Sequence, residues 1–483
     1  MTELAFASAT DLAAKLDAKE VSARELIDLY LDRIEAHNPS LNAIIWMDAD
    51  VARAESDASD QRRANGSLKG PLDGIPVTVK ESFDVTDAPT TWGAPEFRDN
   101  IAHSDSNVVA RYRAAGANVF GKTNVPLMLA DWQSFNEIYG TTNNPWDLTR
   151  TPGGSSGGTA AALAAGMTAL DAGSDIGSSI RNPAHYCGIY GHKPTFDIIS
   201  GRGQSLPGDL SGSDIAVVGP MARSAGDLKL ALDLLAGSDG PNARGWTLNL
   251  PSPRKTALKD YKVSVVLSDP ESDVDQTVQD QILSLAEWLK SEGATVVMDA
   301  RPAFDSKDAM EIYTMLLRAA TSKRMTEEMV EQAQSALVNL AEDATTYRRR
   351  MLQAQLMTHR DWLRWNDMRH ALMAGWETFF DDYDLMLCPP AASAAFTQNQ
   401  KGDRFERLIP INGKLIPETD QLFWAGYTGA SYLPGTVAPI GLTPEGLPVG
   451  IQIVGRQFDD RTCLHMAGLI EDGYYRFTPP PGY

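Results

Sequence analysis

Residues 153–158 read Gly-Gly-Ser-Ser-Gly-Gly, and residues 173–181 read Gly-Ser-Asp-Ile-Gly-Ser-Ser-Ile-Arg. Because glycine lets backbone N–H groups approach a ligand closely, each run can hold a serine hydroxyl beside free amide donors. Residues 159–167 between the two runs have small side chains and a high helix propensity. A Gly-Ser run by itself is typical of a flexible linker. Two such loops at the ends of one apolar helix instead indicate a buried site that binds an anion or oxyanion.

The composition is that of a folded protein without broad affinity for nucleic acid. The chain has 483 residues, with 43 basic and 63 acidic side chains and a net charge of -20, which opposes attraction to phosphates. No stretch reaches about 18 consecutive apolar residues, and residues 1–20 do not resemble a signal peptide. Cys187, Cys388 and Cys463 are widely spaced and form no CxxC motif, so we expect three small buried residues in a reducing environment. We therefore expect a cytoplasmic protein without a membrane span.

Hydrophobic periodicity predicts an α/β fold. Helices are expected over two segments of 8–37, over 105–115, from Pro126 onward, over 274–292 and through most of 306–380. Ser8 or Thr10 is expected to cap the first helix, and Ser22 with Glu25 forms a capping box for the second. Strands are expected over 73–85, 117–121, 261–268, 295–298, 384–390 and 450–455.

The β-α-β succession from 261 to 298 is typical of a parallel sheet. We therefore expect a single large α/β domain over 1–483, in which helices cover both faces of a mixed, mostly parallel sheet. Its parts are a helical layer over about 1–65, a catalytic core over about 66–236, and a C-terminal part over about 255–475 that completes the sheet and the pocket.

A serine hydroxyl needs a base before it can attack a carbonyl group. None of the seven histidines has a partner motif, and the chain contains no Gly-x-Ser-x-Gly elbow. His185 and His192 follow the second loop, and we expect them to make structural hydrogen bonds. Lys80 is the alternative base, because a lysine on an interior strand loses hydration and its pKa falls. A solvated lysine at a sheet edge is the competing interpretation.

Several motifs together resemble the amidase signature family, from about residue 8 to about residue 472. They are Gly74-Ile-Pro-Val-Thr-Val-Lys80, the two Gly-Ser runs, Asn144-Pro-Trp-Asp147, Cys187-Gly-Ile-Tyr-Gly-His-Lys-Pro194, Gly219-Pro-Met-Ala-Arg223 and Gly446-Leu-Pro-Val-Gly-Ile-Gln452. The resemblance implies an amidase signature fold and a serine hydrolase that cleaves carboxylic amide C–N bonds through an acyl-enzyme. It implies no metal and no cofactor.

The resemblance also implies a role for each residue of the site. Ser179 is the nucleophile, Ser155 relays the proton after a cis peptide bond from Gly154, and Lys80 is the base. The implied oxyanion donors are the backbone N–H groups of Ile176, Gly177, Ser178 and Ser179. Ser156, Asp175 and Arg181 are implied supports. The sequence departs from the family at Ser174, where Thr is usual, and at Ser178, where Gly is usual and where the side chain is expected to alter the pocket.

The substrate is predicted less firmly than the reaction. Family topology implies a pocket of apolar and aromatic residues, suited to a hydrophobic or aryl small-molecule amide: Met128, Ala130, Trp132, Gln133, Tyr427, Tyr432 and Leu433, with the Met-rich helices near 310–330. An aromatic stripe of this kind is also typical of a core. The site could also hydrolyse esters or carbamates (a urethanase activity), and the sequence does not decide between these activities. The expected oligomeric state is a monomer or a homodimer.

Two other functions stay open. One is a glutamine-hydrolysing amidotransferase subunit that works within a complex. Residues 340–376 lack the Leu-Gly-Thr-Tyr-type signature that we associate with those subunits and read LMTHRDWL over 356–363. The other is a noncatalytic binding protein on the same fold, against which the presence of Lys80, Ser155 and Ser179 together argues.

Overall fold

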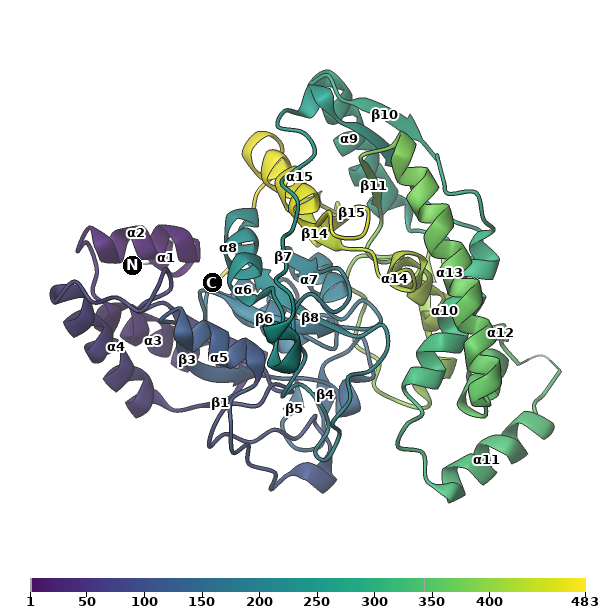
Figure 1. Cartoon of the computed structure of the whole chain (residues 1–483), viewed down its shortest axis with the longest axis horizontal. Helices are drawn as coiled ribbons and strands as arrows, with labels where there is room; N and C mark the ends of the chain where they lie inside the picture. Colours follow the sequence, from purple (N-terminus) through teal and green to yellow (C-terminus); the bar gives the residue numbers. More distant parts are fainter. Residues whose placement is uncertain (1, 343) are drawn as a thin grey trace.

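Strands form the centre of the molecule in the computed structural model, which describes residues 2–342 and 344–483 (Figure 1). Eight strands form one sheet in the order β10-β9-β11-β15-β14-β7-β8-β6. Their bounds are β6 (Asp171–Asp175), β7 (Tyr190–Lys193), β8 (Val217–Ala222), β9 (Lys262–Val265), β10 (Thr295–Met298), β11 (Leu385–Cys388), β14 (Gly435–Leu442) and β15 (Pro448–Val454). The predicted single-domain α/β fold with a large mixed sheet is confirmed.

The expectation that this sheet is mostly parallel is wrong. Strand β9 pairs in parallel with β10 and β11, as the β-α-β pattern predicts, whereas every other neighbouring pair in the sheet is antiparallel. Strands β14 and β15 are joined by the short connection 443–447, and a short connection can join only antiparallel strands. The sequence pattern did not reveal β6, β7, β8 or β14.

A second sheet carries Lys80. Its strands are β1 (Ile44–Met47), β2 (Pro76–Lys80) and β3 (Asn118–Thr123), in the order β1-β3-β2. The N–H group of Thr78 donates a hydrogen bond of 3.2 Å to the carbonyl of Leu170, just before β6 begins. The two sheets are therefore joined at β2 and β6. Two small hairpins complete the strands: β4 (Phe135–Asn136) with β5 (Gly140–Thr141), and β12 (Leu408–Ile411) with β13 (Lys414–Pro417).

The N-terminal helices form a layer at one end of the molecule (Figure 1). They are α1 (Thr2–Ala5), α2 (Ala9–Asp17), α3 (Ala23–Leu41) and α4 (Ala49–Ala64). The hydroxyl of Ser8 caps α2, and Ser22 and Glu25 form the predicted capping box on α3. Of the two predicted caps for the first helix, Ser8 is the correct one, since Thr10 lies within α2.

Six further helices pack against the two sheets. They are α5 (Asn107–Ala114), α6 (Gly157–Ala164), α7 (Arg181–Cys187), α8 (Ala225–Leu235), α9 (Gln276–Ser291) and α15 (Asp460–Gly473). Every residue of α6 is buried, as its small side chains predict. The prediction of a helix from Pro126 onward is wrong. Only a short 3-10 turn, η2 (Leu127–Leu129), forms there, because Met128 and Leu129 have φ angles of 54° and 56° that interrupt a helix.

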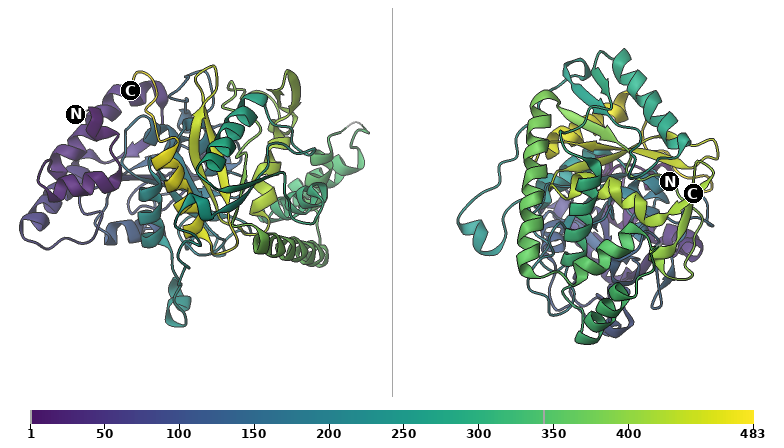
Figure 2. Two further views of the ribbon diagram at one scale, coloured as in Figure 1. Left: turned by 90° about the horizontal axis from the view of Figure 1, so that it is seen from above. Right: turned by 90° about the vertical axis from the view of Figure 1, so that its right-hand side faces the viewer.

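The segment from 306 to 382 forms the predicted helical cover. Its helices are α10 (Ser306–Ala320), α11 (Glu327–Val338), α12 (Thr346–Gln355) and α13 (His359–Asp382). The helix α14 (Leu422–Gly429) packs against α10, and its Trp424 carbonyl accepts a hydrogen bond from Gln452 of β15. Figures 1 and 2 show this cover at the end of the molecule opposite the N-terminal layer. Over the described residues, no helix has both the length and the apolar character needed to cross a membrane.

Candidate active site

Lys80 is the last residue of β2 and is completely buried. Its Nζ atom lies 2.7 Å from Ser155 Oγ, 2.9 Å from Ser174 Oγ and 3.4 Å from the carbonyl oxygen of Ser174. The alternative of a solvated edge lysine is therefore wrong. β2 is covered by β3 on one side and meets β6 on the other, which encloses the amine.

Burial sets the protonation of this amine. Loss of hydration lowers the pKa of Lys80 to about 7, although Asp175, Asp171 and Glu81 each act to raise it. The predicted fall in pKa is confirmed. A large fraction of Lys80 is therefore neutral near pH 7 and able to accept a proton.

The first Gly-Ser run places the Ser155 hydroxyl against the amine of Lys80. The peptide bond between Gly154 and Ser155 is cis, as the resemblance implied. A Cβ atom on Gly154 would lie 2.4 Å from the carbonyl oxygen of Asp131, so no larger residue fits there. The N–H group of Ser156 donates a hydrogen bond of 3.2 Å to the carbonyl of Ser179, which brings the two Gly-Ser runs together.

The second run is partly a strand, not a loop as we expected. Gly173, Ser174 and Asp175 lie on β6, which pairs with β8. A Cβ atom on Gly173 would lie 2.7 Å from Ser156 Oγ and 2.9 Å from the sulfur of Met221, so glycine allows the strand to pack closely there. The turn proper begins at Ile176, and α7 begins at Arg181.

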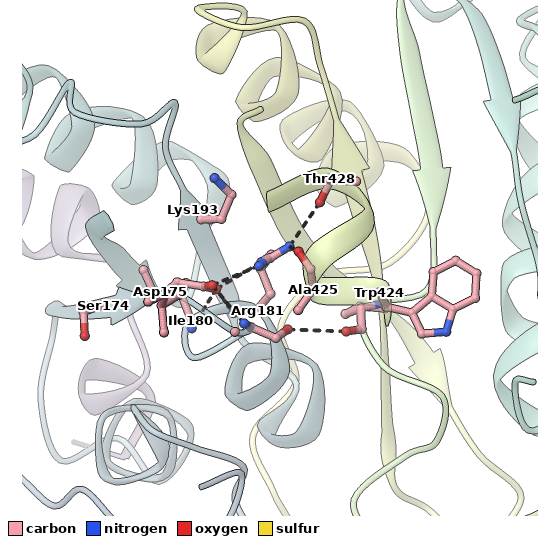
Figure 3. Close-up of polar contacts among 12 residues, drawn as sticks. Ser174, Asp175, Ile180, Arg181, Lys193, Trp424, Ala425 and Thr428 are labelled. Atoms are coloured by element: carbon pink, nitrogen blue, oxygen red, sulfur yellow. Dashed lines mark hydrogen bonds and ion pairs between the residues drawn. The ribbon is translucent and has the colours of Figure 1, made fainter. Parts of the chain in front are cut away.

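Asp175 organises this turn (Figure 3). Its Oδ1 accepts from the N–H of Ser178 at 2.9 Å and from Arg181 Nη2 at 2.9 Å, and its Oδ2 accepts from the N–H of Ile180 at 3.1 Å and from Arg181 Nε at 3.0 Å. Burial alone would raise the pKa of Asp175, but the charge and hydrogen bonds of Arg181 outweigh it and lower the pKa to about 2. Asp175 is therefore an anion held by an arginine.

Arg181 connects the turn to the C-terminal part of the chain. Its Nη1 donates to the carbonyl of Ala425 at 3.1 Å, to Thr428 Oγ1 at 3.2 Å and to Gln452 Oε1 at 2.7 Å (Figure 3 shows the first two). The Asp175–Arg181 pair has no exposed side-chain surface. Its contacts fit the structural support that the resemblance implied for both residues.

Three backbone N–H groups of the turn are available to a ligand. Among the described residues, the N–H groups of Ile176, Gly177 and Ser179 donate no hydrogen bond to a carbonyl or a side chain. The carbonyl of Ile176 accepts from the Tyr313 hydroxyl at 3.1 Å, and that of Gly177 accepts from Trp132 Nε1 at 2.8 Å. These two bonds fix the orientation of the peptide units in the turn.

Ser178 differs from the other three implied oxyanion donors. Its N–H group is bound by Asp175, so it is not free for a substrate, and this part of the expectation is corrected. Its φ angle of 72° explains why glycine is usual at this position in the family. Its hydroxyl is buried and lies 3.4 Å from the carbonyl oxygen of Pro390.

The histidines and cysteines have the structural roles that we expected. His185 Nδ1 accepts from the N–H of Gly450 at 2.7 Å and its Nε2 pairs with the carbonyl of Ser393 at 3.0 Å, while burial lowers its pKa to about 4. His192 lies between Thr436 and Asp460. All three cysteines are buried, and burial raises the pKa of each thiol.

Trp132 is the predicted pocket residue that contacts the turn. Its indole donates to Gly177, and its ring is almost fully buried. Gln133 is instead bound on both sides by the backbone of Asn399, at 2.7 and 2.8 Å, so its amide is not free for a substrate. Met128 lies in the η2 turn and is half-buried, and Ala130 follows this turn and is exposed.

The other predicted pocket residues lie in packed surroundings. Tyr427 is buried among the rings of Phe304, Trp376 and Phe423, and Leu433 is buried as well, so these two are core residues and the prediction is corrected. The hydroxyl of Tyr432 donates to Asp214 at 2.6 Å. Its ring stacks on Phe196 with centroids 4.2 Å apart.

Sequence reasoning missed two residues near the site, Tyr313 and Gln204. Tyr313 belongs to the Met-rich segment that we expected to line the pocket, but no local signal singled it out. Gln204 lies in the loop 194–216 between β7 and β8, and its Nε2 is 3.1 Å from Ser174 Oγ. Two open hollows on the surface, of about 540 and 730 Å³, are lined by other residues. The side chains of Lys80, Ser155 and Ser179 are themselves buried.

Comparison with known proteins shows the family to which this chain is similar. The model of the family described as Amidase matches residues 25–464. The chain is 32% identical to a glutamyl-tRNA(Gln) amidotransferase subunit of Anaeromyxobacter sp. (strain K), over 98% of this chain and 97% of that protein. It is 31% identical to the indoleacetamide hydrolase of Bradyrhizobium diazoefficiens, over 96% of this chain and 86% of that protein.

Solved structures show the same fold. A bacterial aryl acylamidase of the amidase signature family matches with a TM-score of 0.80 and 25% identity, covering 99% of both chains. A protein from a vestigial complex described as revealing the evolutionary origins of an s-triazine catabolic enzyme matches with a TM-score of 0.81 and 27% identity, covering 98% of this chain and 100% of that chain.

The fold and the family model define the class of this protein, a hydrolase that acts on amide C–N bonds. The chain belongs to the amidase family, also called the amidase signature family.

Proposed function

We propose that this protein is a serine hydrolase in which Lys80, Ser155 and Ser179 form the catalytic relay. The observation that carries the proposal is the buried contact of 2.7 Å between Lys80 Nζ and Ser155 Oγ, in a segment whose neighbour Ser156 is bonded to Ser179. A buried amine that is partly neutral near pH 7 can act as a base without a histidine.

Acylation begins when neutral Lys80 accepts the proton of Ser155. Ser155 at the same time accepts the proton of Ser179, whose Oγ attacks the amide carbon. The C–N bond then breaks, and the proton held by Lys80 returns through Ser155 to the leaving amine. Water attacks the acyl-enzyme in the second half of the cycle, with Ser179 as the leaving group and the same relay as its base.

The oxyanion of each tetrahedral intermediate is assigned to the N–H groups of Ile176, Gly177 and Ser179. Donors already oriented before reaction stabilise developing charge without a cost of reorganisation. The bonds from Trp132 and Tyr313 to the carbonyls of this turn support the assignment, because they fix the peptide units. Ser178 is omitted because its N–H group serves Asp175.

The proposed substrate is a small-molecule amide with a hydrophobic or aryl group, with ester and carbamate hydrolysis as further activities of the same site. Trp132 supplies an aromatic side chain beside the turn. The names of two similar proteins, an indoleacetamide hydrolase and an aryl acylamidase, support an aryl substrate. We propose a cytoplasmic enzyme that works as a monomer or a homodimer without a nucleic-acid partner.

Glutamine hydrolysis within an amidotransferase complex is the second candidate function. It is favoured by the 32% identity to the amidotransferase subunit over 98% of the chain. Hydrolysis of glutamine by the purified protein, or copurification of partner subunits, would establish it. Hydrolysis of aryl and alkyl amides without glutaminase activity would support the first candidate.

A fluorophosphonate probe tests the relay without knowledge of the substrate. Ser179→Ala is expected to abolish labelling and turnover, and Lys80→Ala to reduce both to near background while the circular dichroism spectrum stays native. Wild-type labelling of the Lys80 variant at pH 7 would rule out the relay. Absence of labelling in the native protein would instead support a noncatalytic binding protein on this fold.

A further inference from the structure

Gln204, which is outside the proposed relay, is linked to the amine of Lys80 through the hydroxyl of Ser174. Its Nε2 lies 3.1 Å from Ser174 Oγ and 3.2 Å from the Oγ of the buried Ser82. Ser174 Oγ in turn lies 2.9 Å from Lys80 Nζ. A chain of hydrogen bonds therefore runs from a partly buried side chain of the loop 194–216 to the base.

The hydrogen-bonding capacity of each group gives this chain a direction. A neutral lysine amine has two hydrogens and one lone pair, and as a base it must aim the lone pair at Ser155. Its hydrogens then need acceptors, and Ser174 supplies its Oγ and its carbonyl oxygen. The amide NH₂ of Gln204 only donates, so one hydrogen goes to Ser174 Oγ and the other to Ser82.

Ser174 Oγ thus accepts from both Gln204 and Lys80, which occupies its two lone pairs. Its own hydrogen must point elsewhere and cannot compete with Ser155 for the lone pair of Lys80. Without Gln204, the Ser174 hydroxyl is free to rotate and donate to the amine, which would block the base.

We propose that Gln204 is a positioning residue that keeps the Ser174 hydroxyl as an acceptor and thereby aims the lone pair of Lys80 at Ser155. The inference rests on the proposed role of Lys80 as the base. The inference adds to the site a residue of the loop 194–216, which lies outside the two Gly-Ser runs.

The loop that carries Gln204 is fastened to the helical cover at several points. Asp209 pairs with Lys323 at 3.0 Å and with Arg324 at 3.3 Å, both between α10 and α11. Asp214 pairs with Arg369 of α13 at 2.8 Å. These ion pairs attach the loop to the helical cover on the C-terminal side of Gln204.

Acidic groups already face Lys80 from two elements, Asp171 and Asp175 on β6 and Glu81 after β2. A carboxylate at position 204 would add a negative charge from a third side. Because an opposite charge stabilises the ammonium form, Gln204→Glu is expected to raise the pH at which the base becomes active. Gln204→Leu removes the donor with no added charge.

The experiment measures the rate of Ser179 labelling by a fluorophosphonate from pH 5 to pH 10. In this reaction Ser179 Oγ forms a bond to phosphorus, fluoride leaves, and the proton passes through Ser155 to Lys80. Gln204→Glu is expected to shift the midpoint upward by about one pH unit. Gln204→Leu is expected to lower the limiting rate about three- to tenfold without raising the midpoint.

Three controls make the outcome decisive. Gln61→Glu adds the same charge at an exposed position of α4 and should leave the profile unchanged. In a Ser174→Ala background, Gln204→Leu should have no further effect, because the two residues act through one contact. Lys80→Ala tests the proposed function by itself, since full labelling of that variant would overturn the relay and this inference together.

Two results together would overturn the inference and leave the relay intact. They are an unchanged midpoint in Gln204→Glu and a limiting rate of Gln204→Leu within twofold of wild type. Lower rates in both variants with an unchanged midpoint in Gln204→Glu would also overturn the inference, because they would indicate a purely structural role of the loop. If Gln204→Glu does not fold, the double variant of Ser174 and Gln204 decides the question, because independent effects would multiply.

Discussion

At the residue scale, the chemistry of this amidase depends on the environment of a single amine. Lys80 is completely enclosed, and burial brings its pKa to about 7 even though three carboxylates act against this. The same lysine in water would be protonated at neutral pH and unable to act as a base.

The pH dependence of hydrolysis follows from this environment. Protonated Lys80 cannot accept a proton, so kcat/KM for any amide substrate is expected to rise about tenfold per pH unit below pH 7 and to level off above it. Initial rates at substrate concentrations well below KM give this profile. A profile that is flat from pH 5 to pH 9 would contradict the assignment of Lys80 as the base.

Ser178 provides a second test at the residue scale. Ser178→Gly relieves the backbone strain of a residue with a φ angle of 72° and leaves its N–H group bonded to Asp175. We expect kcat/KM to stay within about threefold of wild type and the melting temperature to change little, because relief of strain is offset by the greater freedom of the unfolded chain. A loss of a hundredfold or more would mean that Ser178 contacts the substrate.

At the scale of the element, the turn between β6 and α7 is held by one buried ion pair. Asp175 accepts from three backbone N–H groups and from Arg181, which in turn bonds to residues of α14 and β15. The turn that presents Ser179 therefore depends on elements that lie more than 240 residues further along the chain.

Removal of one partner of this pair should be costly. Asp175→Asn leaves the guanidinium of Arg181 buried without a counter-charge, and we expect a loss of about 3–5 kcal/mol in the free energy of unfolding. Urea denaturation measures the change. As the matched control, Glu287→Gln breaks the exposed pair with Lys290 and should cost less than about 1 kcal/mol. Equal losses in the two variants would contradict this reasoning.

At the scale of the whole molecule, the N-terminal layer is attached to the core by apolar side chains of α2 and α3 and by a few buried polar side chains. Asp227 of α8 accepts from the N–H groups of Ala9 and Thr10 at 2.7 and 2.9 Å, at the start of α2. Arg223 donates to the carbonyl of Ala7 at 2.9 Å and to that of Thr168 at 2.6 Å. The contacts of Asp227 and the bond to Ala7 join residues separated by more than 200 positions.

The attachment can be loosened without damage to the site. Asp227→Ala leaves the first N–H groups of α2 without an acceptor, which costs about 1–3 kcal/mol. Hydrogen exchange measured by mass spectrometry is expected to become faster over residues 2–17, with Ser179 labelling within about twofold of wild type. Faster exchange throughout the core would show that the N-terminal layer is needed for the whole fold.

Local patterns in the sequence predicted a substantial part of the fold. The caps at Ser8 and Ser22, the buried helix α6 and the β9-α9-β10 unit were all readable, because each depends on residues near one another in the chain. The prediction failed at Pro126, where two residues with positive φ replace a helix, and at β6, where a strand forms around a glycine. In both places the packing of distant segments overrides local preference.

The sequence by itself determined which reactive groups are present: a lysine on a β-branched strand, serines among glycines, and no histidine with a partner motif. Only the tertiary structure decided what they can do. The junction of β2 with β6 removes water from Lys80 and sets its pKa, and Asp175 takes one of the four implied oxyanion donors. The loop 194–216 brings Gln204 to Ser174. Burial and hydrogen-bond partners come from segments far apart in the chain, so no local pattern contains them.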